Sequence, residues 1–332
     1  MRKNYIPALL LALVMLLQIP FAEDSFAVSA AKHSAAAGAG AYRLLTGGTA
    51  GETESARSDV AVSVPFSQRK PKVTVKNYRD KTGISWSKVG GAKYYEVYRS
   101  ASAKGRYKRI KKTKKLSYRD ASGESGKVYY YKVRAFKSRT RRSKYSKAVK
   151  FRTVYRVYIA CGHGTNKYGI WDTGCTYNGM QEAQLMLPIT RAFAGYMRNS
   201  GVYVYTDADS GNNKNRDRCI REANSRKISA YVSVHCDWEY APSGTMPLYL
   251  TAEDRKLAEA LNNGVMRMVD IPTRGLVYRT DLHELSRTRA VSCTFETGSI
   301  REDIDLFTND HDRYGKGLAA GLCDYLGVTF RE

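Results

Sequence analysis

From residue 154 onward, short apolar runs alternate with longer segments whose apolar residues recur every three or four positions. The apolar runs, typical of buried strands, are 156–161, 202–207, 230–236 and 290–298. The amphipathic segments, typical of helices, are 181–201, 214–226, 251–269 and 314–327. Pro188 lies inside the first of these helices and should kink it or mark its start. This alternation predicts an α/β domain over residues 154–332, with a mostly parallel or mixed sheet and helices on both faces.

Residues 69–153 follow a different pattern, because polar and apolar residues alternate with a period of two. The clearest run is "VYYYKVRAF" at 128–136, and Gly-containing turn signals separate the runs. About seven short strands at this length predict an antiparallel sandwich. With Trp86 on an early strand, followed by "GGAKYYEVYR" and a closing "SKAVKFRTV", the segment resembles a fibronectin type III domain.

The N-terminal residues predict export. Residues 1–27 combine Arg2 and Lys3 with the apolar stretch "IPALLLALVMLLQIPFA" and following small residues, which is typical of a signal peptide. The alternative is an uncleaved anchor, although the apolar run is short for a membrane span. Residues 28–68 are rich in Ala, Gly, Ser and Thr and predict a flexible linker. We therefore expect a secreted or wall-located protein that has no membrane contact once the signal is removed.

Positive charge is concentrated in one segment. The chain has 55 Lys and Arg against 31 Asp and Glu, and residues 69–152 hold 29 of the basic and 4 of the acidic residues. Such a segment can bind polyanions through counterion release. Outside a cell we expect anionic wall polymers rather than DNA, since no nucleic-acid motif accompanies the charge. A solvated face without a specific partner is the alternative.

Six cysteines, Cys161, Cys175, Cys219, Cys236, Cys293 and Cys323, all lie in the C-terminal half. No two of them form a C-x-x-C pair, which disfavours a structural zinc knuckle. In an exported protein they can form disulfides, and as small buried side chains they can equally remain free.

Three residues with reactive side chains stand at the ends of predicted strands. His163 follows the first strand, His235 ends "AYVSVH" and Glu296 ends "AVSCTFE". Ligands bind at the carboxyl edge of such sheets, so these side chains are expected to meet there. Glu182 opens the helix that follows the His163 loop. Two imidazoles and one carboxylate are typical of an open zinc site, and a further carboxylate can act as general base.

Four short motifs in this half occur in the same order as in a known enzyme family. They are "ACGHG" around His163, "GMQEAQL" around Glu182, "VSVHCD" around His235 and "CTFETG" around Glu296. On these motifs, residues 154–332 resemble the zinc-dependent N-acetylmuramoyl-L-alanine amidases of type 3.

The resemblance implies that His163, Glu182 and His235 bind Zn²⁺ and that Glu296 takes and delivers protons. It also implies a substrate, peptidoglycan, whose amide between N-acetylmuramic acid and L-alanine is hydrolysed. A buried ion pair of Glu296 with Arg287 or Arg289 is the alternative for that residue.

Departures from the family pattern raise further expectations. Ala160 and Cys161 replace the usual Asp-Pro, which removes an aspartate that could orient the histidine and makes Cys161 a candidate metal contact. Four residues are candidates for a substrate groove: Trp171, Asp172, Asp237 and His283. A packed turn around Trp171 and a surface position for His283 are the alternatives.

Two other functions remain open from the sequence. One is a wall-binding protein with a degenerate catalytic half, and the other is a related zinc hydrolase that cuts a different amide. The four motif residues favour the amidase.

Overall fold

The computed structural model describes residues 63–211 and 213–332. The expected signal peptide, 1–27, and all of the expected linker before residue 63 lie outside these residues and stay predictions. Within the described part of the chain, no helix combines the length and the apolar character needed to cross a bilayer.

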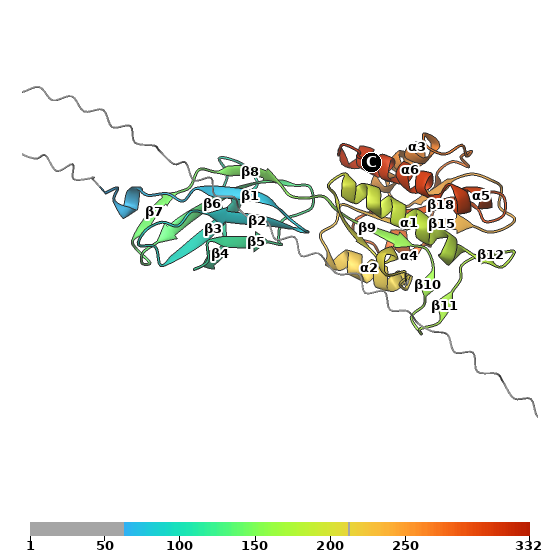
Figure 1. Ribbon diagram of the computed structural model, residues 1–332, viewed down its shortest axis with the longest axis horizontal. Helices are drawn as coiled ribbons and strands as arrows, with labels where there is room; N and C mark the ends of the chain where they lie inside the picture. The colour runs from blue at the N-terminus through green and yellow to red at the C-terminus, as the bar shows by residue number, and fades with distance from the viewer. Residues whose placement is uncertain (1–62, 212) are drawn as a thin grey trace, which may run out of the picture. The chain divides into compact units, whose positions relative to one another are not determined.

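The strands of the basic segment form two antiparallel sheets (Figure 1). In chain order they are β1 (Val73–Tyr78), β2 (Lys81–Trp86), β3 (Tyr94–Ser100), β4 (Lys108–Thr113), β5 (Ser117–Asp120), β6 (Val128–Phe136), β7 (Arg142–Tyr145) and β8 (Val149–Arg152). One sheet has the order β1-β2-β5, and the other has the order β4-β3-β6-β7 with β8 also paired to β6. The predicted antiparallel strands are therefore present.

The period-two pattern explains the core of this segment. Trp86, Tyr95, Val97, Tyr131 and Val133 are buried together, while Lys132 and Arg134, which alternate with the last two on β6, are only partly buried. The basic strand β4 has no buried residue, so its lysines and arginine stay at the surface. The specific resemblance to fibronectin type III domains stays a prediction.

The C-terminal part contains a six-stranded mixed sheet with the order β14-β9-β15-β18-β16-β17. Its strands are β9 (Arg156–Cys161), β14 (Tyr203–Thr206), β15 (Ala230–Asp237), β16 (Met246–Tyr249), β17 (Val277–Tyr278) and β18 (Val291–Ser299). The first four strands in the sheet order are parallel, whereas β16 runs antiparallel to β18. The predicted α/β fold with a mixed sheet is confirmed.

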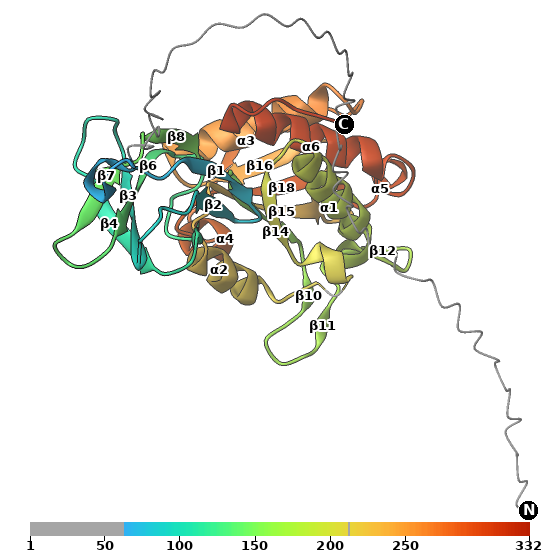
Figure 2. The ribbon, with the colours of Figure 1, turned by 60° about the vertical axis from the view of Figure 1, so that its left-hand side comes forward.

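Helices cover both faces of this sheet (Figure 2). They are α1 (Glu182–Asn199), α2 (Arg216–Ser225), α3 (Ala252–Met266), α4 (His283–Ser286), α5 (Ile304–Asn309) and α6 (His311–Leu326). One apolar core joins α1, α3 and α6 to the sheet, and a smaller core joins α2 to the opposite face. Helix α3 begins with a capping box between Thr251 and Asp254.

Two details differ from the sequence prediction. Helix α1 begins at Glu182 and continues through Pro188, so the alternative that Pro188 starts the helix is wrong. The buried face of α1, with Met186, Ile189 and Phe193, stabilises the helix despite the hydrogen bond that proline cannot donate.

Short strands were also missed. Besides β16 and β17, these are β10 (Gly164–Thr165), β11 (Trp171–Asp172), β12 (Thr176–Tyr177) and β13 (Met180–Gln181). They form two small hairpins, and the β10–β11 hairpin extends away from the sheet in both views (Figures 1 and 2). A strand of two residues has no periodicity to detect.

Candidate metal centre

The backbone around His163 explains why glycines flank this histidine. His163 has a φ of 61° and Gly164 has a φ of 118°, both in the left-handed region. A Cβ atom on Gly162 would lie 2.6 Å from Nδ1 of His235. The chain can therefore turn sharply after β9 and bring the His163 ring against His235 only because no side chain stands at position 162.

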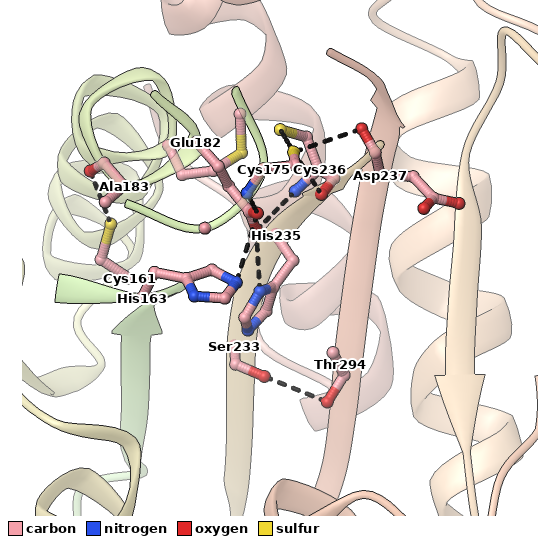
Figure 3. A network of polar contacts seen from close by, with 12 residues as sticks. Cys161, His163, Cys175, Glu182, Ala183, Ser233, His235, Cys236, Asp237 and Thr294 are labelled. Carbon is pink, nitrogen blue, oxygen red and sulfur yellow. Dashed lines mark hydrogen bonds and ion pairs between the residues drawn. The ribbon is translucent and has the colours of Figure 1, made fainter. Parts of the chain in front are cut away.

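Two imidazoles converge on the carboxylate of Glu182 (Figure 3). Nε2 of His163 lies 3.2 Å from Oε2, and Nδ1 of His235 lies 2.9 Å from Oε1. The ring centroids of the two histidines are 5.2 Å apart. One ligand atom from each of the three residues lies within 4.8 Å of the others, which is close enough for all three to hold one metal ion.

Glu182 is enclosed and held from several sides. It is 2% exposed and is the first residue of α1, where the helix dipole stabilises negative charge. The backbone N–H of Cys175 donates to Oε2 and the N–H of Cys236 donates to Oε1, at 3.0 and 3.2 Å. Burial by itself raises the pKa of Glu182, but hydrogen bonds and charge from His163 and His235 hold it well below its usual range. The side chain is a carboxylate ready to bind a cation.

The same carboxylate acts on the histidines. Burial lowers the pKa of His235, yet the hydrogen bond and charge of Glu182, followed by the charges of Glu296 and Glu284, raise it to about 9. The pKa of His163 is also raised, because Glu182 and Asp172 more than offset the effect of burial. Because the pKa of each ring is raised, a metal ion that binds these nitrogens competes with protons more strongly than at ordinary histidines.

A second carboxylate lies beside each imidazole. Oδ2 of Asp172, on β11, lies 3.1 Å from Nδ1 of His163. Oε1 of Glu284, a buried residue of α4, lies 4.0 Å from Nε2 of His235. Asp172 is therefore the carboxylate that can orient the His163 ring in this chain. The sequence analysis missed Glu284, and only its place beside His283 pointed to this segment.

Glu296 lies next to His235 on the neighbouring strand. The two residues are direct partners in the parallel register of β15 and β18. Oε2 of Glu296 is buried and has no hydrogen-bond partner among the described residues. Burial, then the charges of Glu182 and Asp237, raise the pKa of Glu296 to about 7 against the opposing effect of His235 and Arg274. Such a group can exchange a proton near neutral pH.

The alternative for Glu296 was an ion pair with Arg287 or Arg289. Neither pair occurs among the ion pairs of residues 63–211 and 213–332. The backbone of both arginines instead contacts the side chain of Asn224.

A cavity of about 380 Å³ opens over the two imidazoles. The β10–β11 hairpin contributes its loop to the lining, and α2 and α4 contribute the opposite wall. Of the candidate groove residues, Asp172 and His283 line this cavity. The indole N–H of Trp171 donates a hydrogen bond to Oε1 of Gln181, while Asp237 forms an ion pair with Arg274 at 2.9 Å.

Neither Trp171 nor Asp237 is among the residues that line this cavity, and their place in a substrate groove stays a prediction. Cys161 is directed elsewhere: its sulfur contacts the side chain of Asn213 and the carbonyl of Ala183. Among the described residues, Cys161 is not part of any set of side chains close enough together to bind a metal ion.

Comparison with known proteins agrees with this geometry. Residues 157–324 match the family described as N-acetylmuramoyl-L-alanine amidase. The chain belongs to this amidase family. The matched residues span the sheet from β9 to α6 and include all four motif residues.

Solved amidase structures are similar to about half of this chain. The amidase AmiC2 of Nostoc punctiforme is 24% identical, with a TM-score of 0.47, over 52% of this chain and 97% of that one. The catalytic domain of CwlV from Bacillus (Paenibacillus) polymyxa var. colistinus is 21% identical, with a TM-score of 0.47, over 53% and 100%. Ami1 from Mycobacterium smegmatis is 20% identical, with a TM-score of 0.46, over 52% and 97%. No curated protein matched the chain.

Proposed function

We propose that this amidase is a zinc-dependent peptidoglycan hydrolase that cleaves the amide between N-acetylmuramic acid and L-alanine. The observation that carries the proposal is the convergence of His163, His235 and Glu182 beside a fourth residue, Glu296, whose buried Oε2 has no hydrogen-bond partner in the part of the chain that the structure describes.

The donor set fits zinc. Two imidazole nitrogens and one carboxylate oxygen are a common protein ligand set for catalytic zinc and leave a further position open. Nε2 of His163 and Nδ1 of His235 face Glu182 and would be the ligand nitrogens. Asp172 would then hold the other nitrogen of His163, which fixes its tautomer and ring orientation.

The residues of the chain divide the chemistry between them. A bound zinc ion supplies Lewis-acid chemistry, which polarises a carbonyl and lowers the pKa of water. Glu296 accepts the proton of the attacking water and delivers it to the leaving amine, a task that suits a carboxylate with a pKa of about 7. Burial of its oxygen makes this carboxylate more basic than one in water.

The basic segment supports a second part of the proposal. We infer that residues 69–153 form a fibronectin type III-like domain that holds the enzyme on anionic wall polymers. Its strand β4 has the sequence KRIKKT and presents three lysines and one arginine, and only 4 acidic residues are present in 69–152 to offset the basic residues. Export through the signal peptide of residues 1–27 would bring the enzyme to the wall.

The test uses purified peptidoglycan and the full chain. Hydrolysis should release peptides with a free N-terminal alanine and should stop when a chelator removes the metal. Glu296→Gln should lower kcat by about 10²- to 10⁴-fold, the usual contribution of a general acid–base group. Glu259→Gln, which changes an exposed carboxylate of α3, is the matched control and should leave the rate unchanged.

Three results would count against the proposal. Hydrolysis that survives both chelation and Glu296→Gln would exclude the zinc mechanism. Fragments cut at another amide would identify a related hydrolase. Wall binding without any cleavage would identify a degenerate catalytic half.

A further inference from the structure

Two cysteines lie against each other beside Glu182, on the side of the carboxylate away from the imidazoles (Figure 3). The sulfurs of Cys175 and Cys236 are 3.8 Å apart, although the residues are 61 positions apart in the sequence. All six cysteines belong to the described residues, and among these no other pair of cysteine sulfurs is in contact. We propose that Cys175 and Cys236 form a disulfide bond that fastens the cradle of Glu182.

The thiol form is already arranged for this bond. The sulfur of Cys175 lies 3.7 Å from the carbonyl oxygen of Cys236 and 3.5 Å from that of Asp237, so it rests on the end of β15. A disulfide has an S–S distance of about 2.05 Å. The two sulfurs therefore need to approach by about 2 Å to form the bond.

The bond would connect the two segments that hold Glu182. Cys175 donates its backbone N–H to one carboxylate oxygen and Cys236 donates its own to the other. Cys175 stands in the turn before β12, and Cys236 stands in β15 directly after His235. Because both amides contact the same carboxylate, a covalent link between their residues limits the movement of the proposed metal ligand.

The two cysteines differ in exposure, which fixes the order of the reaction. Cys175 is half-buried, whereas Cys236 is 4% exposed. The oxidant is a small or protein disulfide, which outside the cytosol is the usual source of new disulfides. The Cys175 thiolate attacks a sulfur of that disulfide, forms a mixed disulfide and releases one thiol. The Cys236 thiolate then attacks the sulfur of Cys175 and releases the second thiol.

The reaction balances without any further reagent. The two cysteines lose their S–H bonds and the S–S bond of the oxidant breaks. One S–S bond forms in the protein, and the oxidant leaves as two thiols. The cysteine pair loses two electrons and two protons, and the oxidant gains them.

A metal ion is the competing occupant. The sulfurs of Cys175 and Cys236 and an oxygen of Glu182 lie within 4.8 Å of one another, so they could hold a cation. Glu182 would then serve two ions, since the same carboxylate also faces His163 and His235. We favour the disulfide because both carboxylate oxygens already have partners, and the experiment below separates the two occupants.

The first experiment counts thiols in the full chain. The protein is treated with glutathione disulfide, denatured with chelator, alkylated and digested, and the peptides are identified by mass. The expected result is four alkylated cysteines, and one linked pair of peptides that carries Cys175 and Cys236 and has lost two hydrogen masses. Six alkylated cysteines, or a linkage to any other cysteine, would overturn the proposal.

The second experiment measures thermal stability with and without reductant. Cys175→Ala and Cys236→Ala should each lower the Tm of the oxidised protein by about 4–16 °C. The double variant should lose no more than either single variant, because one bond is lost in all three. Reductant should remove most of the difference. Cys323→Ala, which removes a buried thiol from α6, is the control. The difference between its Tm and that of the wild type should be the same with and without reductant.

The third experiment measures zinc affinity by competition with a chelator, and this arm rests on the proposed function. The oxidised chain should bind zinc about 10-fold more tightly than the reduced chain, as expected for a contact that positions a ligand. Equal affinities would refute the effect on the metal ligand. Zinc that binds while six thiols remain would refute the disulfide and leave the proposed function standing.

A linked Cys175–Cys236 pair in a chain that binds no zinc would refute the proposed function and leave the disulfide standing. Two zinc ions per reduced chain, with both thiols protected from alkylation only while zinc is present, would identify the cysteine pair as a metal site and overturn the proposal.

Discussion

Replacing Glu296 with glutamine should make the metal-free protein more stable near pH 8, although it should remove the proposed proton transfer. Burial raises the pKa of Glu296 from 4.5 to about 7, together with the charges of Glu182 and Asp237. Each pKa unit corresponds to about 1.4 kcal/mol. Ionising Glu296 therefore costs about 3 kcal/mol more in the folded protein than in the unfolded chain.

The sign depends on pH. Below the ordinary pKa of 4.5 the carboxyl group is protonated in both states and carries no penalty. As the pH rises from there to about 7, the unfolded chain loses its proton first, so the wild-type protein loses stability. Glutamine is neutral throughout, so Glu296→Gln escapes this loss. The gain of the variant relative to wild type should therefore grow between about pH 5 and about pH 8 by up to about 3 kcal/mol.

Urea unfolding of the metal-free proteins, followed by tryptophan fluorescence at both pH values, measures this gain. Glu259→Gln removes an exposed carboxylate and controls for the loss of charge alone. Zinc should reduce the gain, because a nearby divalent cation stabilises the ionised carboxylate. A gain of equal size at both pH values, or none at either, would show that the site does not penalise the charge of Glu296.

Three further predictions concern the metal centre and the basic segment. Asp172→Asn should lower zinc affinity about 10- to 100-fold in a chelator competition, because an amide holds the imidazole of His163 less firmly than a carboxylate. Gly174→Ala should also weaken zinc binding, since its Cβ would lie 2.4 Å from Oε2 of Glu182, whereas Gly179→Ala, also at positive φ but with open space around it, should not. Deleting residues 69–152 should weaken cosedimentation with cell walls and reduce its dependence on salt, and unchanged binding would remove the targeting role.

The long elements of the catalytic part could be predicted because each buries an apolar face of sufficient length. Helix α1 carries Ile189, Phe193 and Met197 at a spacing of four, and all three are buried. Strands β16 and β17 could not be predicted, because four and two residues are too few to show a period. Pro188 does not set the start of α1, since the buried face of the helix outweighs one missing hydrogen bond.

The candidate site also contains residues that could be predicted from the sequence and residues that could not. His163, His235 and Glu296 could be placed together because parallel strands end at one edge of the sheet, and Glu182 follows by the helix that begins beside them. The contact of Asp172 with His163 could not be predicted, because it depends on how the β10–β11 hairpin folds back. Glu284 reaches His235 from a helix of four residues, a length at which sequence carries little signal.

The β10–β11 hairpin contributes to two parts of the site through two different segments. Its loop residues Asn166, Lys167 and Tyr168 form a wall of the cavity, while Asp172 on its returning strand grips a proposed zinc ligand. If His163 binds zinc as proposed, exchange of the whole hairpin to accept a different peptidoglycan would therefore also change the affinity for zinc. Engineers who wish to alter substrate preference alone should leave the returning strand intact and vary only the tip.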